Sequence, residues 1–276
     1  MTRPVVCLDL DRTVIYSAAA MDLRVPDADA PRLLCVELYR GAPLSFLTEA
    51  AATVLQELQE AATVVPTTTR TPEQLARVHL PGPPARYAIA SNGGHLLVDG
   101  VPDGDWSATV RTALVGCAPQ AEVEAHLRTV DGPFVHSRRV AGDLFAYAVV
   151  DRAALPSGWV DDLAAWCEPR GWTVSLQGRK VYAVPRPLTK SAAAVEVRRR
   201  TGGGPLLAAG DSLLDAELLA VADAAIRPAH GELADASFSL DHLAVTTATG
   251  IWAGEELLRW LHDRAAVGSL SASGSL

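Results

Sequence analysis

Acidic, hydroxyl and lysine side chains stand at four points of the chain where apolar runs end or helical patterns begin. They are Asp9, Asp11, Thr68, Lys190, Asp211 and Asp215. Four carboxylates in one pocket would repel one another strongly unless cations balanced their charge. Carboxylate oxygens suit Mg²⁺, which also accepts phosphate oxygens and water as ligands. The pattern therefore predicts a cation-dependent site for an anionic compound.

A phosphate monoester would suit this site, because it is a dianion whose spontaneous hydrolysis is among the slowest reactions known. We expect Asp9 and Asp211 to be magnesium ligands. Asp215 follows Asp211 by four residues, so on a helix both would share one face, where Asp215 could orient the metal ligands. Lys190, at a predicted helix start, would balance the charge of Asp9 and of the phosphoryl oxygens.

The expected roles follow from the chemistry of phosphoryl transfer. Asp9 would attack phosphorus and form an aspartyl phosphate. Asp11 would protonate the leaving oxygen and then take a proton from the water that hydrolyses the intermediate. Thr68 would donate a hydrogen bond to a phosphoryl oxygen. Its neighbours Thr67 and Thr69 leave open which of the three hydroxyls does so.

The order and spacing of these motifs resemble the haloacid dehalogenase superfamily over about residues 4–250. Its signature is DxDx[TV], a Ser or Thr, a Lys, and an acidic pair such as GDxxxD. The resemblance implies that the backbone carbonyl of Asp11 is a further magnesium ligand. The common family form ATGR maps its threonine onto Thr68 and its arginine onto Arg70, which makes Arg70 a candidate substrate-binding residue.

Three positions depart from the family pattern. Arg12 stands where glycine is common, and Leu214 stands where many relatives have asparagine. Pro66 ends the second predicted strand, where it removes a ladder donor. None of these changes removes a charged group. They therefore affect the assignment to a close subfamily more than the predicted catalysis.

Short apolar runs alternate with helical patterns, which predicts an α/β fold with a Rossmann-like parallel sheet. Ligands bind such sheets at the carboxyl ends of the strands, where the candidate residues stand. We expect this core at 1–104 and 186–264, an inserted α+β cap domain at 105–185, and a disordered tail at 265–276. The position of the insert and the turn at 91–94 resemble the class with a type II cap, which includes Cof-like and sucrose-phosphate phosphatase-like enzymes.

Selectivity for the leaving group is expected from the insert, because the core motifs handle only the phosphoryl group. The polar candidates there are His136, Arg138, Arg139, Arg179 and Lys180. Each of them taken singly is more often a solvated surface charge than a ligand. Residues 17–46, with a predicted hairpin at 33–47, are the alternative source of selectivity, as a flap after the nucleophile loop.

The composition limits the class of partner. A formal net charge of −8 argues against nucleic acid and anionic membranes as partners. The four cysteines form no CxxC pair, so a disulfide framework or zinc site is not expected. Only two of the 24 basic residues are lysines, which favours a specific role for Lys190. The N-terminus lacks the pattern of a signal peptide and no apolar stretch is long enough to span a membrane, so a cytoplasmic protein is expected.

The leading prediction is a magnesium-dependent phosphatase, a phosphoric monoester hydrolase, that acts on a small phosphorylated metabolite such as a sugar or polyol phosphate. A phosphotransferase or mutase would use the same residues with an alcohol in place of water. A non-catalytic phospho-ligand-binding regulator is the third alternative, although it would be expected to lack Asp9, Asp11 or Lys190, which are all present. The sequence predicts neither the individual substrate nor the oligomeric state.

Overall fold

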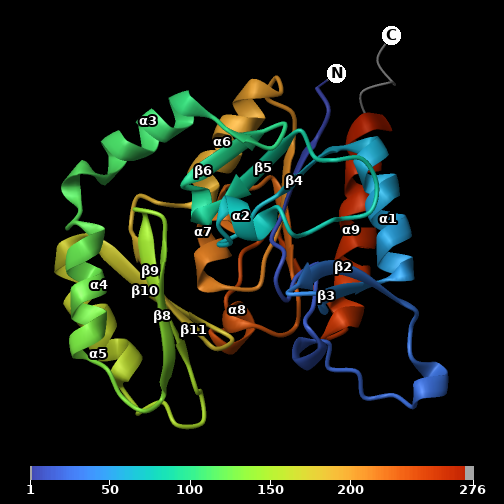
Figure 1. The fold of residues 1–276 in the computed structure, drawn as a ribbon. Coiled ribbons are helices and arrows are strands. Elements are labelled where there is room, and N and C mark those ends of the chain that lie inside the picture. The colour runs from blue at the N-terminus through green and yellow to red at the C-terminus, as the bar shows by residue number, and fades with distance from the viewer. Residues whose placement is uncertain (1, 271–276) are drawn as a thin grey trace. The chain divides into compact units, whose positions relative to one another are not determined.

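The computed structural model describes residues 2–270 of the chain, and the side chains of residues 2–266 (Figure 1). The chain divides into two compact units. The first runs up to Pro102 and resumes at Lys190, and the second is Asp103–Thr189. The insert was expected at 105–185, so the second unit extends a few residues beyond that range at both ends. Within residues 2–270, no helix combines the length and the apolar character needed to cross a membrane.

The first unit is built on a five-stranded sheet in which every neighbouring pair is parallel, in the order β14-β13-β12-β1-β4. The strands are β1 (Val5–Leu8), β4 (Thr63–Pro66), β12 (Leu206–Ala209), β13 (Ala224–Arg227) and β14 (Leu243–Val245). All four residues of β1 are buried, as expected for an apolar run covered on both faces. Pro66 is tolerated because β4 is the edge strand of this sheet. The predicted α/β fold with a parallel sheet is confirmed.

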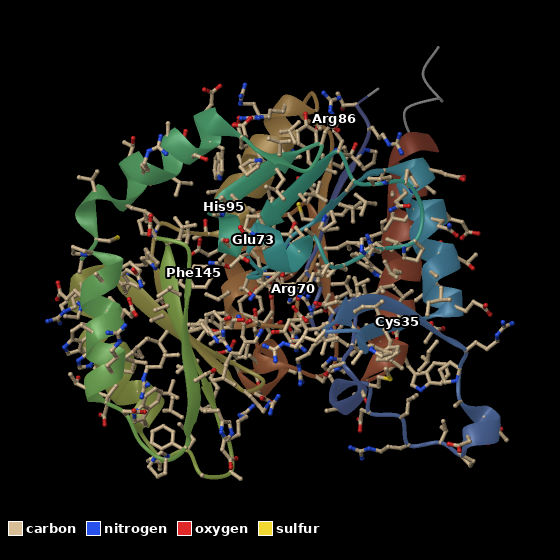
Figure 2. All side chains as sticks on the ribbon, viewed as in Figure 1. Cys35, Arg70, Glu73, Arg86, His95 and Phe145 are labelled. Atoms are coloured by element: carbon tan, nitrogen blue, oxygen red, sulfur yellow. The ribbon has the colours of Figure 1, made fainter. Side chains whose placement is uncertain are left out.

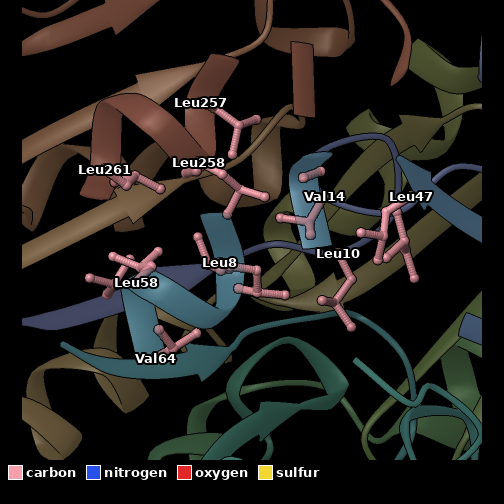
Figure 3. Packing of buried hydrophobic residues seen from close by; sticks show 14 of the residues in the cluster. Leu8, Leu10, Val14, Leu47, Leu58, Val64, Leu257, Leu258 and Leu261 are labelled. Carbon is pink, nitrogen blue, oxygen red and sulfur yellow. The ribbon is translucent and has the colours of Figure 1, made fainter. Parts of the chain in front are cut away.

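Helices cover both faces of this sheet. On one face, α1 (Glu49–Ala61) and α9 (Ile251–Leu270) form a continuous core with β1, in which Leu8, Leu58 and Leu258 are fully buried (Figure 3). Burying each of these side chains contributes roughly 1.5–3 kcal/mol. The other face carries helices α6 (Lys190–Arg200) and α7 (Ala216–Val221).

The expected start of the tail at residue 265 is wrong. Ala265 is fully buried in the core cluster, so α9 continues past it and ends at Leu270. The remaining part of the predicted tail, 271–276, lies outside the residues that the structure describes.

Smaller elements complete the first unit. They are the antiparallel strands β5 (Tyr87–Ala90), β6 (His95–Val98) and β7 (Val101–Pro102), the helices α2 (Pro72–Leu75) and α8 (Glu232–Asp235), and 3₁₀ turns at Ala18–Ala20, Asp27–Asp29, Ser91–Gly93 and Leu213–Asp215. The predicted hairpin is also present, as β2 (Leu33–Tyr39) and β3 (Ala42–Thr48). Its turn is Arg40-Gly41, where φ is 52° and 79°, the positive values that a two-residue hairpin turn requires.

The second unit has one antiparallel sheet with strand order β10-β11-β9-β8. Its elements are α3 (Gly104–Ala113), α4 (Gln120–Thr129), β8 (Val135–Ala141), β9 (Phe145–Val150), α5 (Trp159–Cys167), β10 (Trp172–Gln177) and β11 (Lys180–Pro185), with 3₁₀ turns at Leu114–Gly116 and Glu168–Arg170. Helix α4 packs on β9, and α5 packs on β10 and β11. The buried side chains of these helices, Leu127 and Leu163 among them, form the core of this unit.

Candidate active site

Asp9 lies directly after β1, where the sheet ends, and only 5% of its surface is exposed. Thr13 donates a hydrogen bond from Oγ1 to Asp9 Oδ2 at 2.9 Å. Lys190 donates from Nζ to Asp9 Oδ1 at 2.7 Å. Both carboxylate oxygens of Asp9 therefore have a fixed partner, which holds the side chain in one orientation.

Lys190 is buried at the start of α6 and lies between two carboxylates. Its Nζ is 2.7 Å from Asp9 Oδ1 and 2.6 Å from Asp215 Oδ1. Burial alone would lower the pKa of Lys190, but the charges of Asp215 and Asp9 outweigh it and raise the pKa above its usual value. The lysine is thus held as an ammonium ion at neutral pH.

Asp215 ends a 3₁₀ turn and is fully buried. Its Oδ2 accepts hydrogen bonds from the Ser212 backbone nitrogen at 3.0 Å and from Ser212 Oγ at 2.6 Å. Gly210 is required beside it, because a Cβ there would lie 2.4 Å from Asp215 Cβ. The predicted helical face shared by Asp211 and Asp215 is wrong, since Asp211 precedes this turn and α7 begins only at Ala216.

The carboxylates of Asp9, Asp211 and Asp215 nevertheless come together. One oxygen from each lies within 4.8 Å of the other two, and all three residues are buried. Burial raises the pKa of Asp9 to about 7, even though the Lys190 ammonium opposes the shift. Burial and the neighbouring Asp9 and Asp215 carboxylates likewise hold the pKa of Asp211 well above its usual value.

The three aspartates carry more negative charge than the single Lys190 ammonium neutralises. Arg12 approaches Asp211, with Nε 3.2 Å from Oδ2, but its side chain is 38% exposed. A divalent cation bound by oxygen atoms would relieve this excess, and oxygen is the only ligand type that the three aspartates offer. The residues present therefore fit Mg²⁺.

Arg70 holds Asp11 in place. Arg70 was expected to contact substrate, but its contact with Asp11 was not predicted. Arg70 Nε donates to Asp11 Oδ2 and Arg70 Nη2 donates to Asp11 Oδ1, both at 2.7 Å. This two-bond geometry fixes the plane of the carboxylate. The Asp11 side chain remains 46% exposed, so it is accessible to a bound molecule. The substrate contact of Arg70 stays a prediction.

The threonines after β4 make different hydrogen bonds. Thr67 Oγ1 donates to the Val65 carbonyl oxygen at 2.9 Å, which engages its hydroxyl hydrogen. Thr68 Oγ1 instead accepts from the Arg70 backbone nitrogen at 3.2 Å, a contact that does not use the hydroxyl hydrogen. This difference favours Thr68 over Thr67 as the hydrogen-bond donor to a phosphoryl group.

The candidates in the second unit do not share one face of its sheet. Arg139 pairs with Tyr147, and Tyr147 pairs with Tyr182, so the three side chains lie on the same face. Lys180 joins them, because its Nζ lies 5.8 Å and 6.0 Å from the ring centres of Tyr147 and Tyr182. Arg138, one residue before Arg139, points to the opposite face.

Arg138 is engaged within its own unit, where it donates from Nε to the Leu127 carbonyl oxygen at 3.2 Å and forms an ion pair with Asp131. His136 is exposed at an irregularity in the β8–β9 pairing. Arg179 is exposed in the turn between β10 and β11. These three residues are therefore not brought together with Arg139 and Lys180.

Sequence reasoning missed several residues at these places. Tyr147 and Tyr182 beside Lys180, and Glu37 and Ser45 beside Arg70, were not among the candidates. The strand register, in which Tyr147 pairs with Tyr182, is what shows that the two side chains lie on one face of the sheet. The one available signal for Glu37 was a carboxylate within an apolar strand pattern.

Comparison with solved structures identifies the fold. Sucrose-phosphatase from Synechocystis sp. PCC6803, solved with sucrose and phosphate, aligns with a TM-score of 0.63 and 15% identity over 95% of this chain and 98% of that one. The trehalose-6-phosphate phosphatase C-terminal domain of C. albicans aligns with a TM-score of 0.57 and 11% identity over 95% and 92%. A haloacid dehalogenase subclass IIB sugar phosphatase aligns with a TM-score of 0.55 and 11% identity over 95% and 99%.

No protein-family model and no curated protein sequence matches the chain. The agreement therefore lies in the three-dimensional arrangement, and it extends over nearly the whole length of each of these three proteins. The order of the motifs from Asp9 to Asp215 resembles the haloacid dehalogenase superfamily, to which one of these three proteins is assigned. The chain has the fold of the haloacid dehalogenase superfamily phosphatases, with a second unit of helices and an antiparallel sheet inserted at Asp103–Thr189.

Proposed function

We propose that this protein is a magnesium-dependent phosphatase of a small phosphorylated metabolite, of the sugar or polyol phosphate class. The observation that carries the proposal is the buried cluster of Asp9, Asp211 and Asp215 with the Lys190 ammonium between two of the carboxylates. A buried cluster of three carboxylates with a single ammonium ion is costly if it serves folding alone. A functional requirement for that arrangement explains why it is present.

Asp9 is the nucleophile in this proposal. It attacks phosphorus, the bond from phosphorus to the leaving oxygen breaks, and an aspartyl phosphate forms. Thr13 and Lys190 hold the carboxylate in place before the attack. Lys190 also offsets the repulsion between the carboxylate and the phosphate dianion, while Thr68 donates a hydrogen bond to a phosphoryl oxygen.

Asp11 supplies the proton for the leaving oxygen and then accepts a proton from the water that hydrolyses the aspartyl phosphate. The two hydrogen bonds from Arg70 keep its carboxyl group in a fixed plane during both steps. Magnesium, held by the Asp9 and Asp211 carboxylates and by the Asp11 carbonyl oxygen, would neutralise charge on the transferring phosphoryl group. Asp215 would support this site by holding Lys190.

Metal removal tests the proposed function directly. We expect a chelator to abolish release of inorganic phosphate from phosphorylated sugars and from 4-nitrophenyl phosphate, and added Mg²⁺ to restore it. Magnesium should also raise the melting temperature, because bound cation stabilises the folded state by about 2.7 kcal/mol at one hundred times its Kd. Asp211→Asn is the matched control and should weaken that thermal shift.

Full activity after exhaustive metal removal, verified by elemental analysis, would contradict the magnesium requirement. Release of free phosphate in water also separates a phosphatase from a phosphotransferase or mutase, which would pass the phosphoryl group to an alcohol. The cytoplasmic location stays a prediction.

The sugar or polyol phosphate class is supported by two observations. Solved structures with this fold include a sucrose-phosphatase in complex with sucrose and phosphate. In addition, Tyr147 and Tyr182 stand on one sheet face with Lys180 and Arg139. Aromatic rings next to hydrogen-bond donors offer both an apolar surface and polar partners, which suits a polyhydroxylated leaving group.

A substitution on that face should change selectivity. We expect Lys180→Ala to lower kcat/KM for the best sugar phosphate by about tenfold and to change it less than about twofold for 4-nitrophenyl phosphate. Arg152→Ala, which removes an exposed arginine of the same unit, is the matched control and should leave both values unchanged. An equal decrease of kcat/KM for both substrates in Lys180→Ala would show that Lys180 does not determine selectivity.

A further inference from the structure

Hairpin β2–β3 places a carboxylate inside the protein. Most of β2 is exposed, but Val36 and Glu37 are both buried, which breaks the alternation expected of a strand. The reason is a register shift on each side of Glu37, typical of a β-bulge, which redirects a side chain. The Glu37 side chain is completely buried as a result.

Three polar groups surround this carboxylate. Ser45, on the facing strand, donates from Oγ to Glu37 Oε2 at 2.7 Å. Arg70 Nη1 lies 2.9 Å from the same oxygen, and Arg77 Nε lies 3.2 Å from Oε1. Figure 2 labels Arg70 and, on β2, Cys35 two residues before Glu37. Both carboxylate oxygens of Glu37 therefore contact polar side chains of the same unit.

The Arg70 guanidinium therefore bridges two carboxylates. Its Nη1 faces Glu37, while Nε and Nη2 face Asp11. Only 9% of the Arg70 side chain is exposed, so water cannot replace a missing partner easily. The planar guanidinium presents its donors in a fixed fork, so a bond on the Nη1 side sets the direction of the two bonds on the other side.

We propose that Glu37 is a positioning residue for Asp11, acting through Arg70. This inference rests on the proposed function, in which Asp11 protonates the leaving oxygen. Glu37 keeps the Arg70 fork aligned with the two oxygens of Asp11.

A purely structural role would not require a charge at this position. Burying a carboxylate has a desolvation cost that its partners must offset, and an apolar side chain of similar size would avoid this cost. The bulge and the facing Ser45 are both arranged around the charged group. In this proposal, hairpin β2–β3 helps to position Asp11, a role that the sequence motifs did not assign to residues 17–46.

The test uses Glu37→Gln, which keeps the shape of the side chain and removes its charge. We compare kcat/KM for phenyl phosphate, whose leaving oxygen needs a proton, with kcat/KM for 4-nitrophenyl phosphate, whose leaving oxygen does not. The ratio of the two values is independent of the concentration of active enzyme, so partial unfolding cannot change it. We expect the variant to lower this ratio by about tenfold, a fraction of the effect of a whole acid–base group.

Two controls locate the effect. Leu38→Ala alters the exposed neighbour of Glu37 on the same strand and should leave the ratio unchanged. In an Asp11→Asn background, Glu37→Gln should have no further effect on the ratio, because the group through which it acts is gone. If Glu37→Gln is insoluble, Glu37→Gln with Arg77→Met restores the charge balance and is compared with Arg77→Met alone.

The outcomes separate this inference from the proposed function. Absence of phosphatase activity in the wild-type protein with Mg²⁺ overturns both. Wild-type activity with an unchanged ratio in Glu37→Gln overturns only the role of Glu37. A ratio that falls equally in the presence and absence of the Asp11 carboxyl group also overturns it, since the effect would then bypass Asp11.

Discussion

Asp9→Asn is expected to lower kcat by at least about 10³-fold while the protein stays folded. The amide has nearly the same shape as the carboxylate, but its oxygen is not a nucleophile, so no acyl phosphate can form. The fold should tolerate the change, because the amide oxygen can accept from Lys190 and the amide nitrogen can donate to Thr13 Oγ1. Removing one buried negative charge also reduces repulsion from Asp211.

The measurement is phosphate release at saturating substrate, together with the melting temperature of the metal-free protein. We expect the melting temperature of Asp9→Asn to equal or exceed that of the wild type. Asp9→Ala serves as a second variant, since it cannot recover a carboxylate by deamidation. Activity within about tenfold of wild type in either variant would show that another group attacks phosphorus.

Lys190→Met is expected to cause the second large effect, on both stability and activity. The substitution keeps an apolar stem and removes the ammonium ion that contacts Asp9 and Asp215. Breaking a buried ion pair by removing one partner typically costs about 3–5 kcal/mol, because the other charge is left uncompensated. Phosphate release should fall by at least about 10²-fold as well, since the repulsion between nucleophile and phosphate is no longer offset.

A second substitution separates these two losses. Asp215→Asn in the Lys190→Met background removes one uncompensated carboxylate, and its amide oxygen can still accept from Ser212. We expect this double variant to regain part of the unfolding free energy, measured by denaturant titration, and to remain inactive. Recovery of activity along with stability would mean that Lys190 serves only the fold.

The sequence alone predicted the position of Asp9 in the fold but not the local geometry around Asp211 and Asp215. The buried run at 5–8 and the acidic residues after it sufficed to place Asp9 at the carboxyl end of a parallel strand, because that run could only be buried on both faces. Spacing alone, however, suggested that Asp211 and Asp215 share a helical face. The structure has a 3₁₀ turn there, since Asp215 bonds back to Ser212 and caps the turn locally.

Local signals also failed where a long-range contact outweighed them. Small, polar residues from 265 onward looked like a tail, yet burial of Ala265 in the core continues the helix to Leu270. In the inserted unit, adjacent Arg138 and Arg139 looked equivalent in the sequence. Strand pairing places them on opposite faces, and only Arg139 joins the two tyrosines.

The sequence by itself determined which groups could do chemistry: the aspartates, the threonines after β4, and one of only two lysines. Carboxylates and an ammonium ion are groups that suit a cation-dependent phosphoryl site, so their types alone indicated that chemistry. Tertiary structure alone decided the partners, such as Lys190 between Asp9 and Asp215, and Glu37 behind Arg70. These pairs lie from 25 to 181 residues apart in the chain, and strand register, a bulge and helix packing bring them within hydrogen-bonding distance. No local pattern encodes that outcome, because it depends on how distant segments pack.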